Sequence, residues 1–290
     1  MNKYGEVINN ANLKDYNTYK IGGIAKYLVK PNSVENLKEL INYLKENNIK
    51  YFILGKGSNV ILPDENYDGV VIILEKLNNI EINNNIVTVE SGCSLNKLIN
   101  TLINNNLSGL ENLYGIPGTI GGSIIQNAGC LGTTISDYLE SVTYLENNKI
   151  NEIKKEECNF SYRNSLFKND KNKIIISTKF KLNNGNKDEM MEIVKTNMLN
   201  RKNKQPLEYP NAGSVFKNPE NTSAGKLIED NNLKGYNVFG AYVSEKHANF
   251  IINKDNATSK DIIELINKIQ KIVKNNNKIE LILEQEIIKY

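Results

Sequence analysis

The stretch GIPGTIGGSIIQNAG, residues 115–129, contains five glycines, one proline and no charged residue. Glycine loses more conformational entropy on folding than any other residue, so such a run is costly unless the main chain must turn sharply or be approached closely. One interpretation is a buried, sharply turning connector. The other is a cradle in which backbone N–H groups bind phosphate oxygens. The stretch taken alone favours neither.

Length and composition describe a globular chain with no basic tail or stripe, so any anionic partner must be bound locally. The 290 residues are 40% hydrophobic, which allows a substantial core, and the length suggests about two domains. The 36 basic and 33 acidic residues are interspersed, for a formal net charge of +3, so we expect no nucleic-acid partner. Apolar runs are too short to span a membrane, and the first residues lack a signal peptide's apolar region. We therefore expect a cytoplasmic protein that does not bind membranes.

The residues that usually bind metals are few and scattered. Cys93, Cys130 and Cys158 are far apart with no CxxC pair, and His247 is the single histidine. These numbers predict neither a metal site nor a disulfide framework. We expect His247 to be a structural hydrogen-bonding residue.

Helical and strand-like patterns are mixed along the chain, which predicts an α+β fold. Apolar residues recur at helical spacing over about 33–47, after Ser94, less regularly over about 187–200, and after Thr258, where Thr258 and Asp261 form a possible capping box. Runs typical of strands are KYLVK, KYFIL, VVIIL, IVTVE, SVTYLE, KIIISTKFKL and, near the C-terminus, IELILEQEII.

Known phosphate-binding motifs do not fit the glycines. In YFILGKGSNV a strand-like run precedes Gly55 and Gly57, but Val60 stands where a dinucleotide fingerprint needs its third glycine, and no amphipathic helix follows. No GxxxxGK[ST] sequence of a Walker A loop occurs. What remains is a pair of glycine-rich loops, GKGSN at 55–59 and GIPGTIGG at 115–122, whose N–H groups could bind one diphosphate together.

This pair, in this order, resembles the flavin-binding half of the UDP-N-acetylenolpyruvoylglucosamine reductases, whose fold is similar to that of the vanillyl-alcohol-oxidase flavoproteins. The segments NTYKIGGIAKYLVKP, SYRNSLFK, NAGSVFKNP, SEKHANFIIN and LEQE also resemble family segments in their usual order. The resemblance covers nearly the whole chain. The glycine loops alone suit many flavoproteins, whereas their combination with SYR, AGSVFKNP and the terminal glutamate is highly specific.

The resemblance implies an FAD-containing oxidoreductase of peptidoglycan precursor synthesis. Such an enzyme takes a hydride from NADPH onto FAD and delivers it to the enolpyruvyl group of UDP-N-acetylglucosamine enolpyruvate, forming UDP-N-acetylmuramate. One site serves NADPH and the sugar nucleotide in turn, which agrees with the lack of a separate nicotinamide motif. We expect FAD as cofactor, NADPH as co-substrate, a UDP-sugar as substrate, and a monomer.

Three residues match the family's catalytic positions. Arg163 of SYR would stabilise the substrate carboxylate and the developing enolate through its planar guanidinium. Ser214 of AGSVFKNP would donate the proton to the reduced substrate, and Glu286 of LEQE would assist Arg163 at the carboxylate. Without the family context these would be a surface arginine, a turn serine and a solvated chain end.

The resemblance also implies binding residues. The flavin segments imply contacts from Gly55, Lys56, Gly57, Ser58, Asn59, Gly115, Ile116, Pro117, Gly118, Thr119, Gly121, Gly122, Ala128 and Gly129. Most of these would act through the backbone on the diphosphate, with Ala128 and Gly129 beside the isoalloxazine ring. The substrate positions are Tyr162, Arg201, Lys204, Lys217 and Asn218. Taken alone, Lys217 fits a surface lysine better.

Two departures limit the transfer of family properties. Gln285 stands where the family usually places proline, so the approach of Glu286 to the site could be looser. The chain between Asn164 and Lys204 is short, which places the sequence in the subclass lacking an extra tyrosine-bearing loop.

The predicted architecture has two FAD-binding subdomains and a C-terminal α+β substrate domain. Residues 1–70 with 279–290 would form the first subdomain, 71–203 the second, and 204–278 the substrate domain. Two rival functions remain open: another flavin oxidase or dehydrogenase on the same fold, and a sugar-nucleotide-binding protein that has lost its cofactor.

Overall fold

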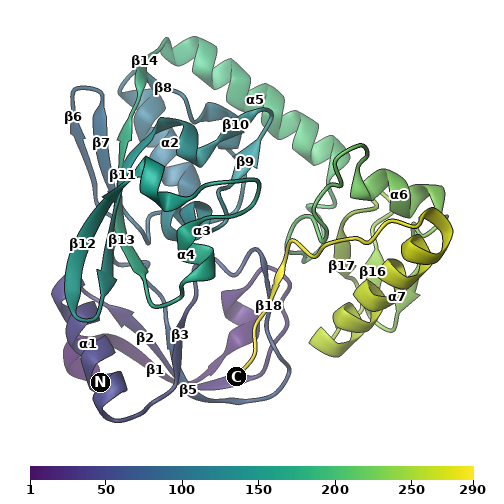
Figure 1. The fold of residues 1–290 in the computed structure, drawn as a ribbon, viewed down its shortest axis with the longest axis horizontal. Coiled ribbons are helices and arrows are strands. Elements are labelled where there is room, and N and C mark those ends of the chain that lie inside the picture. Colours follow the sequence, from purple (N-terminus) through teal and green to yellow (C-terminus); the bar gives the residue numbers. More distant parts are fainter. The chain divides into compact units, whose positions relative to one another are not determined.

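The computed structural model describes residues 1–290 and divides them into two compact units, each made of separate stretches of the chain (Figure 1). The first unit comprises Met1–Asn9, Tyr27–Lys56 and Gly69–Asn200. The second comprises Asn10–Lys26, Gly57–Asp68 and Arg201–Tyr290. Three boundaries fall inside strands, namely β1 (Gly5–Asn12), β2 (Ile24–Pro31) and β5 (Tyr67–Ile72). The three-domain division made from the sequence stays a prediction.

A four-stranded sheet in the order β1-β2-β5-β3 carries helix α1 (Val34–Glu46). Strand β3 (Tyr51–Ile53) runs parallel to β5. The helix begins where predicted because the Ser33 side chain accepts a hydrogen bond from the N–H of Asn36 at 3.1 Å. Its buried face, Leu37, Leu40, Ile41 and Leu44, packs against a core that includes Val70 and Ile72 of β5.

A five-stranded antiparallel sheet in the order β12-β11-β13-β7-β6 forms the largest part of the first unit. Its strands are β6 (Ile80–Asn83), β7 (Ile86–Glu90), β11 (Leu139–Glu146), β12 (Lys149–Lys154) and β13 (Ile174–Lys181). Helices α2 (Leu95–Asn104) and α3 (Ile120–Ile125) pack against this sheet and share its core. The strand-like runs IVTVE, SVTYLE and KIIISTKFKL are thereby confirmed as strands.

Short elements complete the first unit. They are β8 (Leu107–Ser108) paired with β14 (Asn183–Asn184), β9 (Gly129–Cys130) paired with β10 (Thr133–Thr134), and helix α4 (Leu166–Asn169). Single 3-10 turns of this unit lie at Asn2–Tyr4, Glu111–Leu113, Ile135–Tyr138 and Lys155–Cys158, and a further one at Leu13–Tyr16 belongs to the second unit.

Helix α5 (Lys187–Lys204) extends the irregular helix predicted at 187–200 by four residues. Only Met190, Val194 and Asn197 are buried along its length. A helix with so narrow a covered face shows a weak apolar period, which explains why the sequence pattern there is poor. The boundary between the two units falls within α5, between Asn200 and Arg201.

The second unit contains a three-stranded antiparallel sheet and two helices around its own core. The sheet has the order β15-β16-β17, with β15 (Asn237–Val238), β16 (Ala241–Val243) and β17 (Ile251–Asn253). The helices are α6 (Ala224–Asp230) and α7 (Ser259–Asn277). The predicted capping box of α7 is confirmed, because the N–H of Thr258 donates to Asp261 and the N–H of Asp261 donates back to Thr258.

The last segment differs from the strand predicted over IELILEQEII. Only β18 (Glu286–Ile287) is a strand, paired in parallel with β4 (Val60–Ile61), and Leu283 forms a single bridge with Phe216. The apolar run therefore changes partner along its length instead of joining one sheet.

Candidate active site

The second glycine loop is held in the first unit by main-chain hydrogen bonds. Gly115 donates its N–H to the Asn96 side chain at 2.9 Å, and the N–H of Leu95 donates to the carbonyl of Gly118. Beyond it, Ile120 and Gly121 donate to the carbonyls of Cys93 and Ser91 at 2.8 and 2.9 Å. The loop thus docks along residues 91–96 as a tight connector that leads into helix α3, and the phosphate cradle stays a prediction.

Two N–H groups at the turn into α3 have no partner in the protein. The hydrogen bonds of this loop use the carbonyl of Gly118 and the side chain of Thr119 but neither residue's N–H. Both residues are partly exposed, so a bound acceptor can reach them. Such adjacent donors suit an anionic oxygen.

The first glycine loop contacts the second within the first unit. A Cβ added to Gly55 would lie 2.9 Å from the Thr119 hydroxyl oxygen, so the loops meet closely at this point. The boundary between the units falls after Lys56. In the second unit, Gly57 has φ +65°, and a Cβ there would lie 2.5 Å from the carbonyl oxygen of Tyr16. Glycine is required at both positions, at Gly55 for close approach and at Gly57 for conformation as well.

Arg163 lies at the tip of a two-residue turn in the first unit. Ser161 and Asn164 exchange both backbone hydrogen bonds around Tyr162 and Arg163, and Arg163 has φ +54°. Its guanidinium donates to the carbonyl of Gly129 at 2.9 Å and lies 5.2 Å from the Tyr162 ring centre. A non-glycine residue at positive φ is strained, and such strain concentrates at functional sites. The structure therefore brings the predicted catalytic arginine to the predicted flavin residue Gly129.

The arginine turn is tied to the end of α3 by buried polar side chains. Ser165, fully buried, donates its hydroxyl to the carbonyl of Ile125 at 2.8 Å. Asn127, 6% exposed, donates its amide to the carbonyl of Ser161 at 3.1 Å, while its own amide oxygen has no partner. A buried acceptor left unpaired is costly unless a ligand completes it. Asn127 is therefore a candidate site residue that the sequence analysis did not single out, although it lies within the quoted glycine stretch.

Ser214 lies in the second unit on a segment that contacts residues 249–250 and the last segment of the chain. It bridges Phe250, and the next residue, Val215, accepts a hydrogen bond from the N–H of Glu284 at 2.8 Å. The Asn249 side chain holds Phe216 by both backbone groups, accepting from its N–H at 3.0 Å and donating to its carbonyl at 2.8 Å. The predicted proton donor is thus carried by backbone that cannot shift alone.

Glu286 follows on the last segment of the same unit. Its N–H donates to the carbonyl of Asn59 at 2.9 Å, in the pairing of β18 with β4. The Asn59 side chain returns a hydrogen bond to the carbonyl of Glu284 at 3.2 Å. The predicted flavin residue Asn59 is therefore linked directly to the predicted catalytic Glu286.

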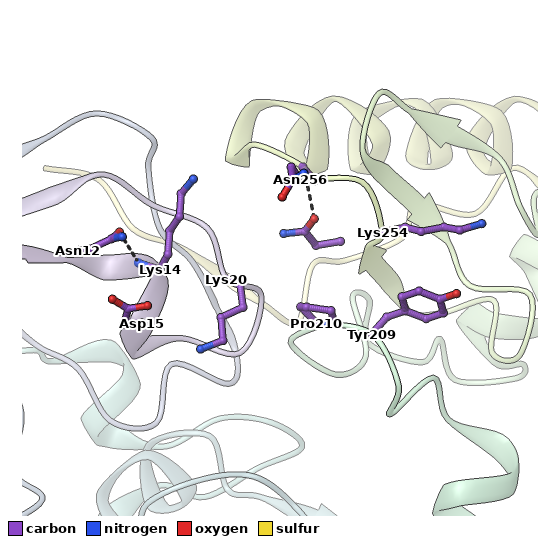
Figure 2. Close-up of a pocket in the computed structure, with 10 residues that line it drawn as sticks. Asn12, Lys14, Asp15, Lys20, Tyr209, Pro210, Lys254 and Asn256 are labelled. Carbon is purple, nitrogen blue, oxygen red and sulfur yellow. Dashed lines mark hydrogen bonds between the residues drawn. The ribbon is translucent and has the colours of Figure 1, made fainter.

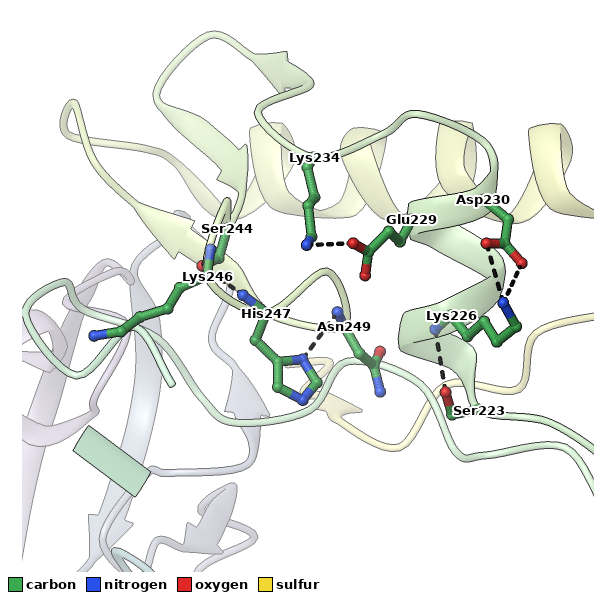
Figure 3. Close-up of polar contacts among 9 residues, drawn as sticks. All are labelled: Ser223, Lys226, Glu229, Asp230, Lys234, Ser244, Lys246, His247 and Asn249. Carbon is green, nitrogen blue, oxygen red and sulfur yellow. Dashed lines mark hydrogen bonds and ion pairs between the residues drawn. The ribbon is translucent and has the colours of Figure 1, made fainter. Parts of the chain in front are cut away.

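His247 contacts Asn249, the residue whose side chain holds Phe216, and Figure 3 shows this contact. The ring Nδ1 of His247 accepts a hydrogen bond from the backbone N–H of Asn249 at 3.2 Å. The backbone N–H of His247 donates to the Ser244 hydroxyl at 3.3 Å. Burial lowers the pKa of His247 below its ordinary value of 6.5, which keeps the ring neutral and able to accept. This is the structural hydrogen-bonding role that we expected.

The predicted substrate residues fall in both units. Tyr162 is 54% exposed in the first unit. Arg201 and Lys204 are in the last turn of α5, and Lys217 and Asn218 follow Phe216, all four in the second unit. Asn218 accepts the N–H of Ala224 and so also helps to begin α6.

A hollow of about 450 Å³ in the second unit, shown in Figure 2, is lined by a different set of residues. Its cationic side chains are Lys14, Lys20 and Lys254, with Asp15 as the acidic member. The sequence analysis assigned no role to these lysines, although Lys20 lies in the quoted segment NTYKIGGIAKYLVKP.

No group of three or more His, Cys, Asp or Glu side chains is placed to hold a metal ion. No helix is long and apolar enough to cross a membrane.

Two models of known protein families match this chain, one in its N-terminal half and one near its C-terminus. A model described as an FAD binding domain matches residues 25–148, and one described as the C-terminal domain of UDP-N-acetylenolpyruvoylglucosamine reductase matches residues 205–288.

Individual relatives match over almost their full length. The UDP-N-acetylenolpyruvoylglucosamine reductase of Clostridium novyi is 45% identical over 98% of this chain and 92% of that protein. The reductase of the same name from Carboxydothermus hydrogenoformans is 43% identical over 97% of this chain and 94% of that protein. The crystal structure of UDP-N-acetylenolpyruvylglucosamine reductase from Thermus caldophilus has a TM-score of 0.84 at 33% identity and covers 98% of each chain. The chain therefore belongs to the UDP-N-acetylenolpyruvoylglucosamine reductase family, the FAD-containing oxidoreductases of peptidoglycan precursor synthesis.

Proposed function

We propose that this chain reduces the enolpyruvyl group of UDP-N-acetylglucosamine enolpyruvate to give UDP-N-acetylmuramate, with NADPH as the source of the hydride. The observation that carries this proposal is the junction of the two glycine loops at Gly55 and Thr119, with Arg163 held against Gly129 in the same unit. Hydride transfer from a flavin to a substrate with a carboxylate needs two things from the protein. One is a site that binds the cofactor's phosphates, and the other is a fixed cation near the flavin ring.

The residues present fit FAD. The unpaired N–H groups of Gly118 and Thr119 suit a diphosphate, and the unpaired amide oxygen of Asn127 suits the imide N–H of an isoalloxazine ring. When bound, FAD supplies two-electron transfer between nicotinamide and substrate. The residues that would hold it are Gly55, Lys56, Gly57, Ser58, Asn59, Gly115, Ile116, Pro117, Gly118, Thr119, Gly121, Gly122, Ala128 and Gly129.

Arg163 is proposed to bind the substrate carboxylate. Its bond to the carbonyl of Gly129 and its contact with the Tyr162 ring fix the plane of the guanidinium before substrate arrives. A preset planar donor stabilises charge that develops on the carboxylate without having to reorganise during the reaction.

Ser214 is proposed to give the proton that completes the reduction, and Glu286 to act with Arg163 at the carboxylate. A hydroxyl is a weak acid, but a carbanion or enol next to it is a strong base, so position decides the rate. The preceding Gly213 has φ +74° and open space around it, which lets the chain turn at Ser214.

For the sugar nucleotide we propose contacts from Tyr162, Arg201, Lys204, Lys217 and Asn218. Lysines give point charges to a diphosphate, and the exposed Tyr162 ring offers a face for stacking. We also propose that the protein works in the cytoplasm as a monomer.

The test is an absorbance spectrum of the purified protein followed by titration with NADPH and then with the enolpyruvyl sugar nucleotide. We expect a yellow protein that NADPH bleaches and the sugar nucleotide recolours. A colourless protein favours a binding protein that has lost its cofactor. A yellow protein that NADPH bleaches and the sugar nucleotide does not recolour favours another flavin dehydrogenase.

Ser214→Ala tests the proton-donor assignment within the same experiment. We expect bleaching by NADPH at the normal rate and recolouring slowed by about 100-fold or more. The matched control is Ser223→Ala, which removes a hydroxyl that caps α6 and has no proposed role in chemistry. Equal slowing of both half-reactions by Ser214→Ala refutes the assignment.

A further inference from the structure

Gln285 is the most completely bonded buried polar side chain near the C-terminus. It is 3% exposed. Its amide nitrogen donates to the carbonyls of Ala212 and Gly213 at 3.1 and 3.2 Å, and its amide oxygen accepts from the Tyr19 hydroxyl at 3.1 Å. Both amide hydrogens and one oxygen lone pair are therefore used, and the two carbonyls on one side fix which end of the amide is nitrogen.

These bonds join the two stretches that carry the proposed proton donor and carboxylate. Gly213 directly precedes Ser214, and Gln285 directly precedes Glu286. The only other bonds described between these stretches are between backbone groups, from Glu284 to Val215 and from Lys217 to Ile282. Gln285 thus adds side-chain hydrogen bonds to the residues just before Ser214, next to this backbone pairing.

Tyr19 anchors the amide from the opposite side. Its ring is fully buried in the core that contains Phe216 and Leu281, and its backbone carbonyl accepts from the Asn253 side chain at 2.9 Å. Burial raises the pKa of the Tyr19 hydroxyl above its ordinary value, so the group stays protonated and able to donate at neutral pH. The direction of the bond from Tyr19 to Gln285 is therefore fixed.

We propose that Gln285 is a positioning residue that holds Ser214 and Glu286 in register for the protonation step. The inference rests on the proposed function, because it gives Gln285 a role only through those two residues. Gln285 stands where the family usually places proline, and its three hydrogen bonds are the restraint that this proposal sets against a looser approach of Glu286.

Position is what the proton donor depends on. A weak acid transfers its proton only when it lies within hydrogen-bond reach of the receiving carbon, and a shift of about 1 Å can cost about 100-fold in rate. Reduction by NADPH needs no proton from Ser214. Loss of Gln285 should therefore slow one half-reaction and spare the other.

The experiment compares Gln285→Leu with Gln270→Leu in the FAD-loaded, full-length protein. Gln270 also donates its amide to the last segment, at the carbonyl of Leu281 at 2.8 Å, and it is partly buried. For Gln285→Leu we expect recolouring by the sugar nucleotide to slow by about 10- to 100-fold, with bleaching by NADPH and the KM for the sugar nucleotide changed less than about 3-fold. For Gln270→Leu we expect both half-reactions to stay normal.

Tyr19→Phe is a milder second variant in case Gln285→Leu fails to fold. It removes the donor to the Gln285 oxygen but leaves the two bonds to Ala212 and Gly213, so we expect slowing of recolouring by about 3- to 10-fold. Hydrogen exchange of residues 212–217 in the cofactor-free protein gives a readout independent of turnover. Faster exchange of these amides is expected in both variants and not in Gln270→Leu.

The outcomes separate this proposal from the proposed function. If Ser214→Ala slows recolouring selectively while Gln285→Leu and Tyr19→Phe react normally, the role of Gln285 is refuted and that of Ser214 stands. Equal loss of both half-reactions in Gln285→Leu likewise refutes a positioning role. If Ser214→Ala itself shows no selectivity, the proton-donor assignment of Ser214 fails and the positioning role of Gln285 fails with it, whereas the reductase activity is still judged by recolouring of the unsubstituted protein.

Discussion

The glycine loop of the first unit and the Ser214 segment of the second unit are held in place by different kinds of contact. In the first unit, the glycine loop rests on residues 91–96 through backbone bonds and a tight contact of Gly121 with Ser91, and Gly92 in turn lies so close to Leu74 that a Cβ cannot fit. In the second, the segment at Ser214 is held by the side-chain amides of Asn249 and Gln285. We therefore expect the first arrangement to be disturbed by a substitution that adds a Cβ to a glycine. The second should be disturbed by a substitution that removes a side-chain amide.

The largest effect is expected from Gly92→Ala. A Cβ at Gly92 would lie 1.7 Å from the carbonyl oxygen of Leu74, and the neighbouring Ser91 and Cys93 carry the glycine loop. We expect a loss of about 3 kcal/mol or more in the free energy of unfolding, measured by urea denaturation, because the backbone has to move apart.

Gly132→Ala is the matched control for this prediction. Gly132 has φ +79° but nothing within 4 Å of an added Cβ, so only backbone strain of about 1 kcal/mol is expected. The view that the first unit depends on close main-chain packing is wrong if the two variants lose the same stability.

The next largest effect is expected from Asn249→Leu in the second unit. Leucine leaves the buried N–H and carbonyl of Phe216 without partners, so we expect a loss of about 2 kcal/mol by urea denaturation. Asn231→Leu is the control, because its amide bonds lie at a partly exposed helix end and should cost about 0.5 kcal/mol. Similar losses in both would contradict the importance of buried amides in this unit.

A smaller, pH-dependent effect is expected from His247. Its pKa is lowered in the folded state by burial, so above pH 6.5 both states are neutral and its contribution is complete. As the pH falls below 6.5 the unfolded state binds the proton first, and stability declines. The ring is partly exposed, so we expect less than about 1 kcal/mol between pH 7 and pH 5.

Because His247 is the only histidine, His247→Gln isolates this contribution. We expect the difference between thermal unfolding curves at pH 7 and pH 5 to shrink in the variant. An unchanged pH dependence would assign the decline to carboxylates instead.

The smallest effect on stability, but a sharp one on reactivity, concerns the cysteines of the first unit. Cys93 and Cys158 are fully buried, and burial raises the pKa of both thiols, that of Cys158 to about 12. Cys130, next to Gly129 in β9, is partly exposed. In the native protein we expect one thiol to react quickly with a disulfide reagent, and Cys130→Ser to remove that phase with little change in stability. Persistence of the fast phase in the variant would show that the packing around Cys93 or Cys158 opens readily.

The sequence predicted elements well where local signals were sufficient. Helices α1, α2 and α7 follow their caps at Ser33, Ser94 and Thr258, because capping and apolar spacing are properties of adjacent residues. The last segment was predicted as one strand because its apolar content is high. Its pairing depends on Phe216 and on β4, and neither is visible in the local pattern.

The candidate site residues were predicted by resemblance to a known family. The residues that hold them in place, such as Tyr19 and Gln285, were not predicted. The bond from Tyr19 to Gln285 joins residues 266 positions apart, and that from Gln285 to Ala212 joins residues 73 apart. A buried glutamine has no periodic signal, so only the folded structure shows what it holds. Asn127 was within the quoted stretch, but its unpaired oxygen follows from burial, which the sequence does not give.

Because β18 pairs with β4, the second unit joins an early and a late stretch of the chain. Strand β4 is made early, yet its partner at Glu286–Ile287 emerges only after almost everything else. The second unit therefore stays open during translation, and its early residues 10–26 and 57–68 must wait while the intervening first unit folds. The link between Asn59 and Glu286 is therefore among the last contacts of the chain to form.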